Sequence, residues 1–189
     1  DVEELDRLLT PLEMELGISP GSTPVIALVT ETAAAMFTTG DYADAPRLVA
    51  MTWGAEDLAD SIGAMSNRLE DGEYSFTYEL ARSLTLLGAA AAGVPAIETI
   101  DGDFRNLEGL KARAEKVRRD GYRGMLAIHP AQVPVINEAF SPGEDEIAEA
   151  REIVALFEAN PQAGTIGHNG KMLDRPHLSR ARQLMAQVD

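Results

Sequence analysis

The chain of 189 residues has no cysteine, which excludes disulfide bonds, thiolate metal ligands and cysteine nucleophiles. It has no apolar run near the roughly 18 residues that a membrane-spanning helix needs. Basic residues are scarce, because 16 Lys and Arg stand against 31 Asp and Glu, for a formal net charge of -15. Nucleic acids and anionic membranes attract clustered Lys and Arg, so neither is an expected partner. The lack of cysteine also fits a reducing compartment, and we expect a cytoplasmic protein.

Common catalytic signatures are missing too: there is no P-loop, no G-x-G-x-x-G, no H-E-x-x-H and no serine in a G-x-S-x-G elbow. The first residues, Asp1 to Asp6, are acidic where a secretory signal would be basic. Apolar residues then recur at helical spacing and predict an amphipathic helix over residues 2–16. A chain that opens directly in a helix, with no start methionine, is typical of a segment of a longer protein.

Short apolar runs bounded by turn residues predict buried strands with helices between them. The predicted strands are 25–30, 48–53, 96–100 and 124–128. The further predicted helices are 31–39, 57–65, 76–92, 106–120, 131–138, 143–159 and 175–187. The glycine-containing segment 160–174 is predicted to be a linker, so only helices are expected after residue 130. Alternation of strand and helix indicates parallel βαβ units, which either a half barrel or an open doubly wound sheet would contain.

Two acidic residues follow the first two predicted strands. Glu31 ends the first apolar run, and Asp57 follows the turn after the second. Parallel α/β folds carry their chemistry at the carboxyl ends of strands, so these carboxylates would form an oxygen-rich site suited to Mg²⁺. The alternative is structural, with one residue capping a helix and the other in a solvated loop. Asp174 has a similar alternative, as the N-cap of the last helix.

Several motifs, taken in order, resemble the citrate lyase β-subunit branch of the HpcH/HpaI aldolase superfamily, which includes malyl-CoA and citramalyl-CoA lyases. The motifs are Leu28–Ala33, Trp53–Leu58, Asp103–Leu110, Ala127–Val133, Asn137–Phe140 and Gly170–Asp174. The resemblance implies an α/β fold, a (β/α)₈ TIM barrel of which about the last four strands are present, with a C-terminal helical extension. Residues 1–140 would be the C-terminal half of the barrel, and residues 141–189 a helical extension and lid.

The resemblance also implies a reaction. A Mg²⁺-dependent carbon–carbon lyase would cleave a β-hydroxyacyl-CoA thioester, of the citramalyl-CoA or malyl-CoA type, into acetyl-CoA and a small keto acid. Glu31 and Asp57 would be the Mg²⁺ ligands and would face the substrate. The main-chain N–H groups of Glu56 and Asp57 would hold the substrate carboxylate, and Asp174 would be the catalytic acid–base.

The resemblance further suggests that Ile128, His129 and Pro130 line the pantetheine channel of CoA, although a lone histidine at a strand end is more often structural. Because the tail aspartate of CoA-dependent members serves a neighbouring subunit, a homo-oligomer is expected, a trimer or hexamer. Three alternatives stay open: a citrate lyase β-subunit that acts on an acyl-carrier-protein thioester, an aldolase that uses no thioester, and a non-catalytic half-barrel fragment.

Overall fold

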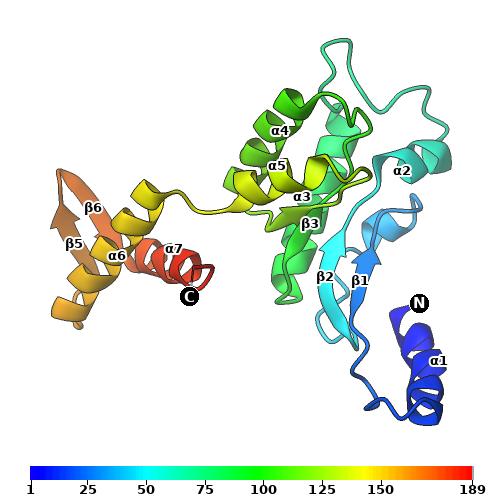
Figure 1. Cartoon of the computed structure of the whole chain (residues 1–189), viewed down its shortest axis with the longest axis horizontal. Coiled ribbons are helices and arrows are strands. Elements are labelled where there is room, and N and C mark those ends of the chain that lie inside the picture. Colours follow the sequence, from blue (N-terminus) through cyan, green and yellow to red (C-terminus); the bar gives the residue numbers. More distant parts are fainter. Residues whose placement is uncertain (189) are drawn as a thin grey trace. The chain divides into compact units, whose positions relative to one another are not determined.

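The computed structural model describes residues 1–188 and contains two compact units, Asp1–Phe140 and a second unit that begins at Ser141. The first unit contains a four-stranded sheet of β1 (Val25–Leu28), β2 (Leu48–Thr52), β3 (Ala96–Glu98) and β4 (Gly124–Met125). The strands pair in the order β1-β2-β3-β4, and every pair is parallel (Figure 1). The predicted parallel α/β architecture is therefore confirmed.

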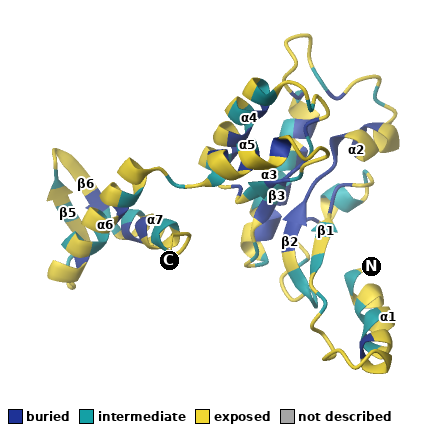
Figure 2. Ribbon diagram, in the orientation of Figure 1, coloured by how far each residue is buried: buried dark blue, intermediate teal, exposed yellow. Residues whose placement is uncertain are grey.

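Helices follow the strands and bury one face of the sheet. They are α2 (Ala55–Ile62), α3 (Phe76–Ala91), α4 (Leu107–Asp120) and α5 (Gln132–Phe140), whereas α1 (Val2–Glu15) precedes the first strand. Met51 and Trp53 pack with Tyr78 and Ala81 of α3 in the main apolar core. Figure 2 shows β2 and α3 in the dark, buried centre of the unit. Gly88 lets α3 approach the loop before β2, because a Cβ there would lie 2.1 Å from the Thr39 carbonyl oxygen.

The predicted helix over residues 31–39 is wrong, because only a single 3-10 turn, η1 (Ala35–Phe37), forms there. Its alanines favour a helix, but tertiary contacts override that propensity. The Ala33 main-chain N–H donates to the Ser61 hydroxyl of α2 at 2.9 Å, which ties this segment to α2. The strands are also shorter than predicted, since they end at Leu28, Thr52, Glu98 and Met125.

The second unit consists of α6 (Glu144–Ala159), β5 (Thr165–His168), β6 (Lys171–Asp174) and α7 (Arg175–Met185). The predicted linker over residues 160–174 is therefore wrong, since β5 and β6 form an antiparallel hairpin. Asn169 and Gly170 connect the strands with φ values of 49° and 74°, as a two-residue type I′ turn requires. Phe157, Leu173 and Leu178 form the buried core of this unit.

Helix α1 is held to the first unit through polar contacts made by Arg47. The Arg47 guanidinium donates to Asp6 at 2.6 Å, to Thr10 at 2.8 Å and to Glu13 at 2.6 Å, and its side chain is 1% exposed. Glu13 also accepts bonds from the main-chain N–H groups of Gly21 and Thr23. Arg47 and these further hydrogen bonds hold the pKa of Glu13 well below its usual range.

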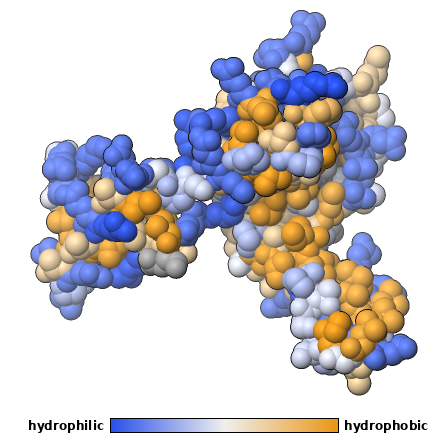
Figure 3. Space-filling view, viewed as in Figure 1, coloured by the Kyte–Doolittle hydropathy of each residue, from blue (hydrophilic) through white to orange (hydrophobic). Residues whose placement is uncertain are grey.

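The opposite face of α1 exposes apolar side chains. Leu8 is 59% exposed and Leu12 is 52% exposed. Figure 3 shows apolar surface over this helix, at the lower right of the view. The helix is thus anchored by its polar side, the reverse of the usual arrangement for an amphipathic surface helix.

Within residues 1–188, every helix is too short or too polar to cross a lipid bilayer.

Replacing Arg47 by Met should detach α1 and lower the melting temperature by several degrees, because Glu13 would then be a buried carboxylate without its charged partner. Arg47→Lys should give an intermediate value, since an ammonium group keeps the charge but loses the planar fork. Amide hydrogen exchange over residues 2–15 should accelerate most in Arg47→Met. Unchanged exchange there would show that Arg47 does not anchor the helix.

Candidate functional site

A buried hydroxyl joins the carboxyl ends of β1 and β2. Thr30 Oγ1 accepts a bond from the Gly54 main-chain N–H at 2.8 Å and donates to the Gly54 carbonyl oxygen at 3.2 Å. Thr30 is fully buried, at 0% exposure. One side chain therefore satisfies both main-chain groups of Gly54 and fixes the loop after β1 against the start of α2.

This bridge sets the positions of the two predicted metal ligands. Glu31 follows Thr30 directly, and Asp57 lies in the first turn of α2, three residues after Gly54. A Cβ at position 54 would lie 3.1 Å from Asp57 Oδ2 and 3.4 Å from the Leu28 side chain. Glycine at this position thus leaves room for the Asp57 carboxylate beside the ends of both strands.

Both carboxylates are exposed, and neither has a hydrogen-bond or ion-pair partner in the part of the chain that the structure describes. The structural alternative that one of them caps a helix is wrong, because the N-caps are Gly54 for α2 and Ala34 for η1. Residues 1–188 contain no group of three or more His, Asp or Glu side chains that could hold a metal by themselves. Two free carboxylates suit Mg²⁺, which keeps several waters and takes few protein ligands.

The first turn of α2 also offers main-chain donors. Ala55, Glu56 and Asp57 are the first residues of this helix, and no side chain caps it. Their N–H groups therefore have no helical partner and carry the positive end of the helix dipole. The Glu56 carboxylate accepts a bond from the Asn67 amide through one of its oxygens, at 2.9 Å.

A buried carboxyl joins the ends of β2 and β3. Glu98 Oε1 accepts bonds from the Trp53 indole N–H at 2.8 Å and from the Thr99 main-chain N–H at 3.0 Å. Glu98 Oε2 is buried without a partner among the described residues. Burial raises the pKa of Glu98 to about 7, although the charge of Arg82 and the two hydrogen bonds oppose that effect.

A buried amide joins the ends of β3 and β4. Gln132 is fully buried, and its side-chain N–H donates to the Asp101 carbonyl oxygen at 2.9 Å. Its side-chain oxygen accepts from the main-chain N–H groups of Ile128 at 2.9 Å and His129 at 3.2 Å. Ile128, His129 and Pro130 are all exposed on this loop, and the His129 ring stacks on Phe104 with 4.8 Å between centroids.

The sequence analysis did not single out Thr30, Glu98 or Gln132, although each fixes a loop at the carboxyl edge of the sheet. A signal was present for two of them. Thr30 and Glu98 are polar residues at the end of or within otherwise apolar strand patterns, and buried polar groups need a partner. Gln132 lies in a helix and had no comparable signal.

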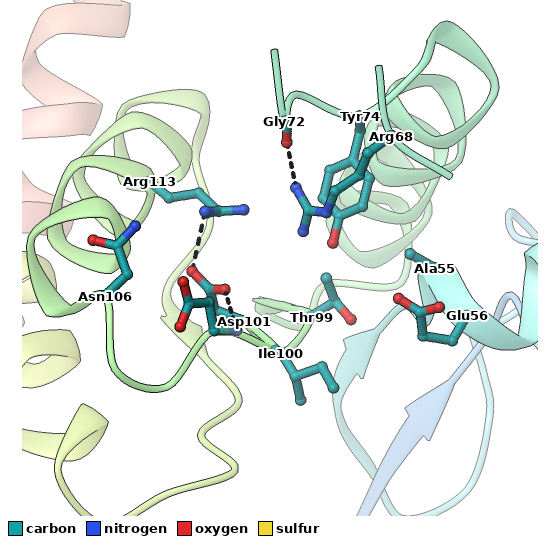
Figure 4. Close-up of a pocket in the computed structure, with 12 residues that line it drawn as sticks. Ala55, Glu56, Arg68, Gly72, Tyr74, Thr99, Ile100, Asp101, Asn106 and Arg113 are labelled. Carbon is teal, nitrogen blue, oxygen red and sulfur yellow. Dashed lines mark hydrogen bonds and ion pairs between the residues drawn. The ribbon is translucent and has the colours of Figure 1, made fainter. Parts of the chain in front are cut away.

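Next to this edge lies a cavity of about 260 Å³, formed by the loop before α3 and the start of α4 (Figure 4). Arg68 stacks on the Tyr74 ring and donates to the Gly72 carbonyl oxygen at 2.7 Å. Arg113 pairs with Asp101 at 3.1 Å. Two guanidinium groups and the carboxylates of Glu56, Asp101 and Asp103 line the cavity, so its walls carry both signs of charge.

Asp174 belongs to the second unit, where it ends β6 and caps α7. Its carboxylate accepts from the His177 main-chain N–H at 3.4 Å and lies 2.5 Å from His177 Nδ1. Contact with His177 holds the pKa of Asp174 below its usual range. The capping role that the sequence suggested for Asp174 is therefore present.

Comparison with known proteins identifies the family to which this chain belongs. A model of the HpcH/HpaI aldolase/citrate lyase family matches residues 1–130. The chain belongs to the HpcH/HpaI aldolase/citrate lyase family. A citrate lyase subunit beta-like protein of Mycobacterium tuberculosis is 35% identical over 87% of this chain and 59% of its own length. The L-malyl-CoA/beta-methylmalyl-CoA lyase of Cereibacter sphaeroides is 32% identical over 100% of this chain and 64% of its own length.

A solved structure shares the fold. The CitE protein of Mycobacterium tuberculosis, in complex with magnesium, acetoacetate and coenzyme A, superimposes with a TM-score of 0.74 at 29% identity, over 94% of this chain and 72% of that one. The family resemblance that the motifs suggested is thus confirmed. This chain spans about three fifths of the length of each of the two curated relatives.

Replacing Thr30 by Val should lower the free energy of unfolding by about 1–3 kcal/mol, because both main-chain groups of Gly54 would be buried without a partner. Thr30→Ser keeps the hydroxyl and should recover most of that stability. Urea unfolding of the three proteins measures the difference. Equal losses in both variants would mean that packing of the methyl group, and not the hydroxyl bridge, is what matters.

Glu98 should make stability fall as pH rises. Its folded pKa, about 7, lies above the ordinary value of 4.5, so the folded state binds more protons between these values and loses stability as pH rises through them. Relative to Glu98→Gln, the wild type should lose about 3 kcal/mol between pH 4.5 and pH 8. Unfolding of both proteins at several pH values tests this, and a constant difference would contradict it.

Proposed function

We propose that the protein is a Mg²⁺-dependent carbon–carbon lyase that cleaves a β-hydroxyacyl-CoA thioester, of the citramalyl-CoA or malyl-CoA type, into acetyl-CoA and a keto acid. The observation that carries the proposal is the pair of unpartnered carboxylates, Glu31 and Asp57, held at the ends of adjacent strands by the Thr30–Gly54 bridge. Relatives that act on malyl-CoA or bind magnesium, acetoacetate and coenzyme A support the same chemistry.

Glu31 and Asp57 would hold the Mg²⁺ ion. When bound, the ion would supply a Lewis acid that stabilises developing oxyanion charge and orients the keto-acid half of the substrate. The N–H groups of Glu56 and Asp57, at the start of α2, would hold the substrate carboxylate, because main-chain donors and the helix dipole both favour an anion there.

Asp174 would move the proton as a general acid–base, a contribution typically worth about 10²–10⁴-fold in rate. The exposed Ile128–His129–Pro130 loop, fixed by Gln132, would line the pantetheine arm of CoA. Since a tail aspartate of this kind serves a neighbouring subunit, we propose a homotrimer or hexamer. The absence of cysteine supports a cytoplasmic location.

We further propose that the four-stranded sheet is the C-terminal half of a (β/α)₈ barrel, with the second unit as its helical extension and lid. Parallel strands in sequential order, each followed by helical structure or a loop, support this assignment. Ile26 and Leu28 support it as well: they lie on the sheet face away from the helices and are 54% and 38% exposed. The remaining strands of a barrel would cover these apolar side chains.

A thioester on an acyl-carrier protein is the second candidate substrate, favoured by the similarity to a citrate lyase subunit beta-like protein. The two substrates differ in what carries the acyl group. Cleavage of the free CoA thioester should be efficient if the first proposal holds, whereas only the carrier-bound thioester should react if the second one does.

The test is release of acetyl-CoA from citramalyl-CoA and malyl-CoA by the full-length protein, with Mg²⁺ and with excess chelator. Glu31→Gln and Asp57→Asn should each weaken Mg²⁺ binding by at least about 100-fold, since even indirect supports of a metal contribute 10–100-fold. Titration calorimetry with Mg²⁺ measures that loss independently of turnover, and cleavage should fall in parallel.

Asp60→Asn is the matched control, because Asp60 is an exposed carboxylate on the same helix, one turn further on. It should bind Mg²⁺ and cleave as the wild type does. Full-length protein that cleaves neither CoA thioester would refute the CoA-lyase proposal. Wild-type Mg²⁺ affinity in both Glu31→Gln and Asp57→Asn would refute the metal assignment.

A further inference from the structure

One nitrogen of His177 lies within hydrogen-bonding distance of two groups on Asp174. His177 Nδ1 is 2.5 Å from Asp174 Oδ1 and 3.2 Å from the Asp174 main-chain nitrogen. Leu173 and Leu178, next to the pair in sequence, are 7% and 4% exposed and fix its backbone in the core of the second unit. The two polar side chains themselves stay about one third exposed, so a substrate could reach the carboxylate.

These two contacts of Nδ1 make opposite demands. A main-chain N–H donates, so Nδ1 must be unprotonated to accept that bond, whereas a carboxylate oxygen accepts, so Nδ1 must carry a proton to donate to it. The Nδ1–Oδ1 contact joins an imidazole nitrogen to a carboxylate oxygen, the pairing of a charge-assisted hydrogen bond. An ionised carboxylate has no proton to donate, so the Nδ1–Oδ1 contact is a hydrogen bond only when Nδ1 carries the proton.

We propose that His177 is a positioning residue that shares a proton with Asp174, so that the acid–base group is a carboxylate–imidazole pair. This inference rests on the proposed function of Asp174. In the cleavage direction, the pair takes the proton of the substrate hydroxyl. The O–H electron pair forms the carbonyl of the keto acid, and the electron pair of the broken C–C bond forms the thioester enolate. The pair then returns the proton to the enolate carbon, so no proton is gained or lost.

The charged surroundings of the pair favour the ionised carboxylate. Arg180, on the same helix, adds to the effect of His177 and lowers the pKa of Asp174. From α6, Glu146 and Glu149 line a cavity of about 260 Å³ together with His177 and Arg180. The imidazole therefore lies among carboxylates from α6 and from Asp174, with Arg180 beside it.

The first test measures the tautomer of His177 by ¹⁵N NMR of the ring near neutral pH. Proton sharing predicts a proton on Nδ1 in the wild type, and a shift to the Nε2–H tautomer in Asp174→Asn. His168 is the internal control, because its Nε2 faces Glu152 at 3.0 Å and it should not respond. A wild-type Nε2–H tautomer, with Nδ1 accepting only the main-chain N–H, would reduce His177 to a helix cap and overturn the proposal.

The second test is kinetic and uses the full-length protein. His177→Gln keeps the capping main-chain N–H but cannot exchange a proton, so kcat should fall about 10–100-fold with little change in KM. His168→Gln, in the same unit, should keep the wild-type kcat. Melting curves of both variants verify that they fold.

Wild-type kcat in His177→Gln across the accessible pH range would overturn the proposal. Failure of the underlying function looks different: Asp174→Asn would then retain full activity, whatever the NMR result. Proton sharing in the NMR spectra with an active Asp174→Asn would leave the pair as a structural cap and refute its role in the reaction.

Discussion

Side-chain bridges between neighbouring strand ends determine the geometry of the carboxyl edge in this family member. Where parallel strands end, main-chain N–H and C=O groups no longer have hydrogen-bond partners in the neighbouring strand. When buried, they need other partners. Thr30 supplies them between β1 and β2, the Glu98 carboxyl joins β2 to β3 through Trp53, and Gln132 joins β3 to β4. Each bridge is buried, so water cannot replace it at low cost.

The predicted ligands depend on these bridges although they make none of them. Glu31 and Asp57 are exposed and unpartnered, so their own contacts do not fix their positions. The Thr30–Gly54 bridge fixes the backbone of both, and the missing Cβ at Gly54 leaves space for the Asp57 carboxylate. Free carboxylates on a rigid backbone are what a hydrated divalent cation needs, since its other ligands come from water and substrate. At the same edge, burial destabilises the ionised form of the Glu98 carboxyl and so raises its pKa.

Much of the fold follows from local pattern. Apolar runs predicted four strands, and their alternation with helices predicted parallel pairing, because a crossover long enough for a helix returns the chain in the same direction. Predictions from the sequence pattern were wrong where tertiary contacts or turn residues determined the local structure. The segment around Ala33 is tied to Ser61 of α2 and forms only a 3-10 turn, and the Asn169–Gly170 turn makes a hairpin of a segment whose glycines suggested a linker. The Asn-Gly pair was a usable signal for the hairpin, whereas nothing near Ala33 pointed to Ser61, 28 residues away.

The sequence by itself determined the parallel α/β architecture, the placement of Glu31 and Asp57 after adjacent strands and the family, because these depend on periodicity and on the order of motifs. Only the tertiary structure decided that Thr30 joins the two loops, that Glu98 is buried with a raised pKa and that Gln132 supports the His129 loop. It also decided that His177 Nδ1 meets the Asp174 carboxylate rather than solvent. Periodicity records which face of an element is buried, but hydrogen bonds between distant segments depend on register and rotamer, which the linear chain does not encode locally.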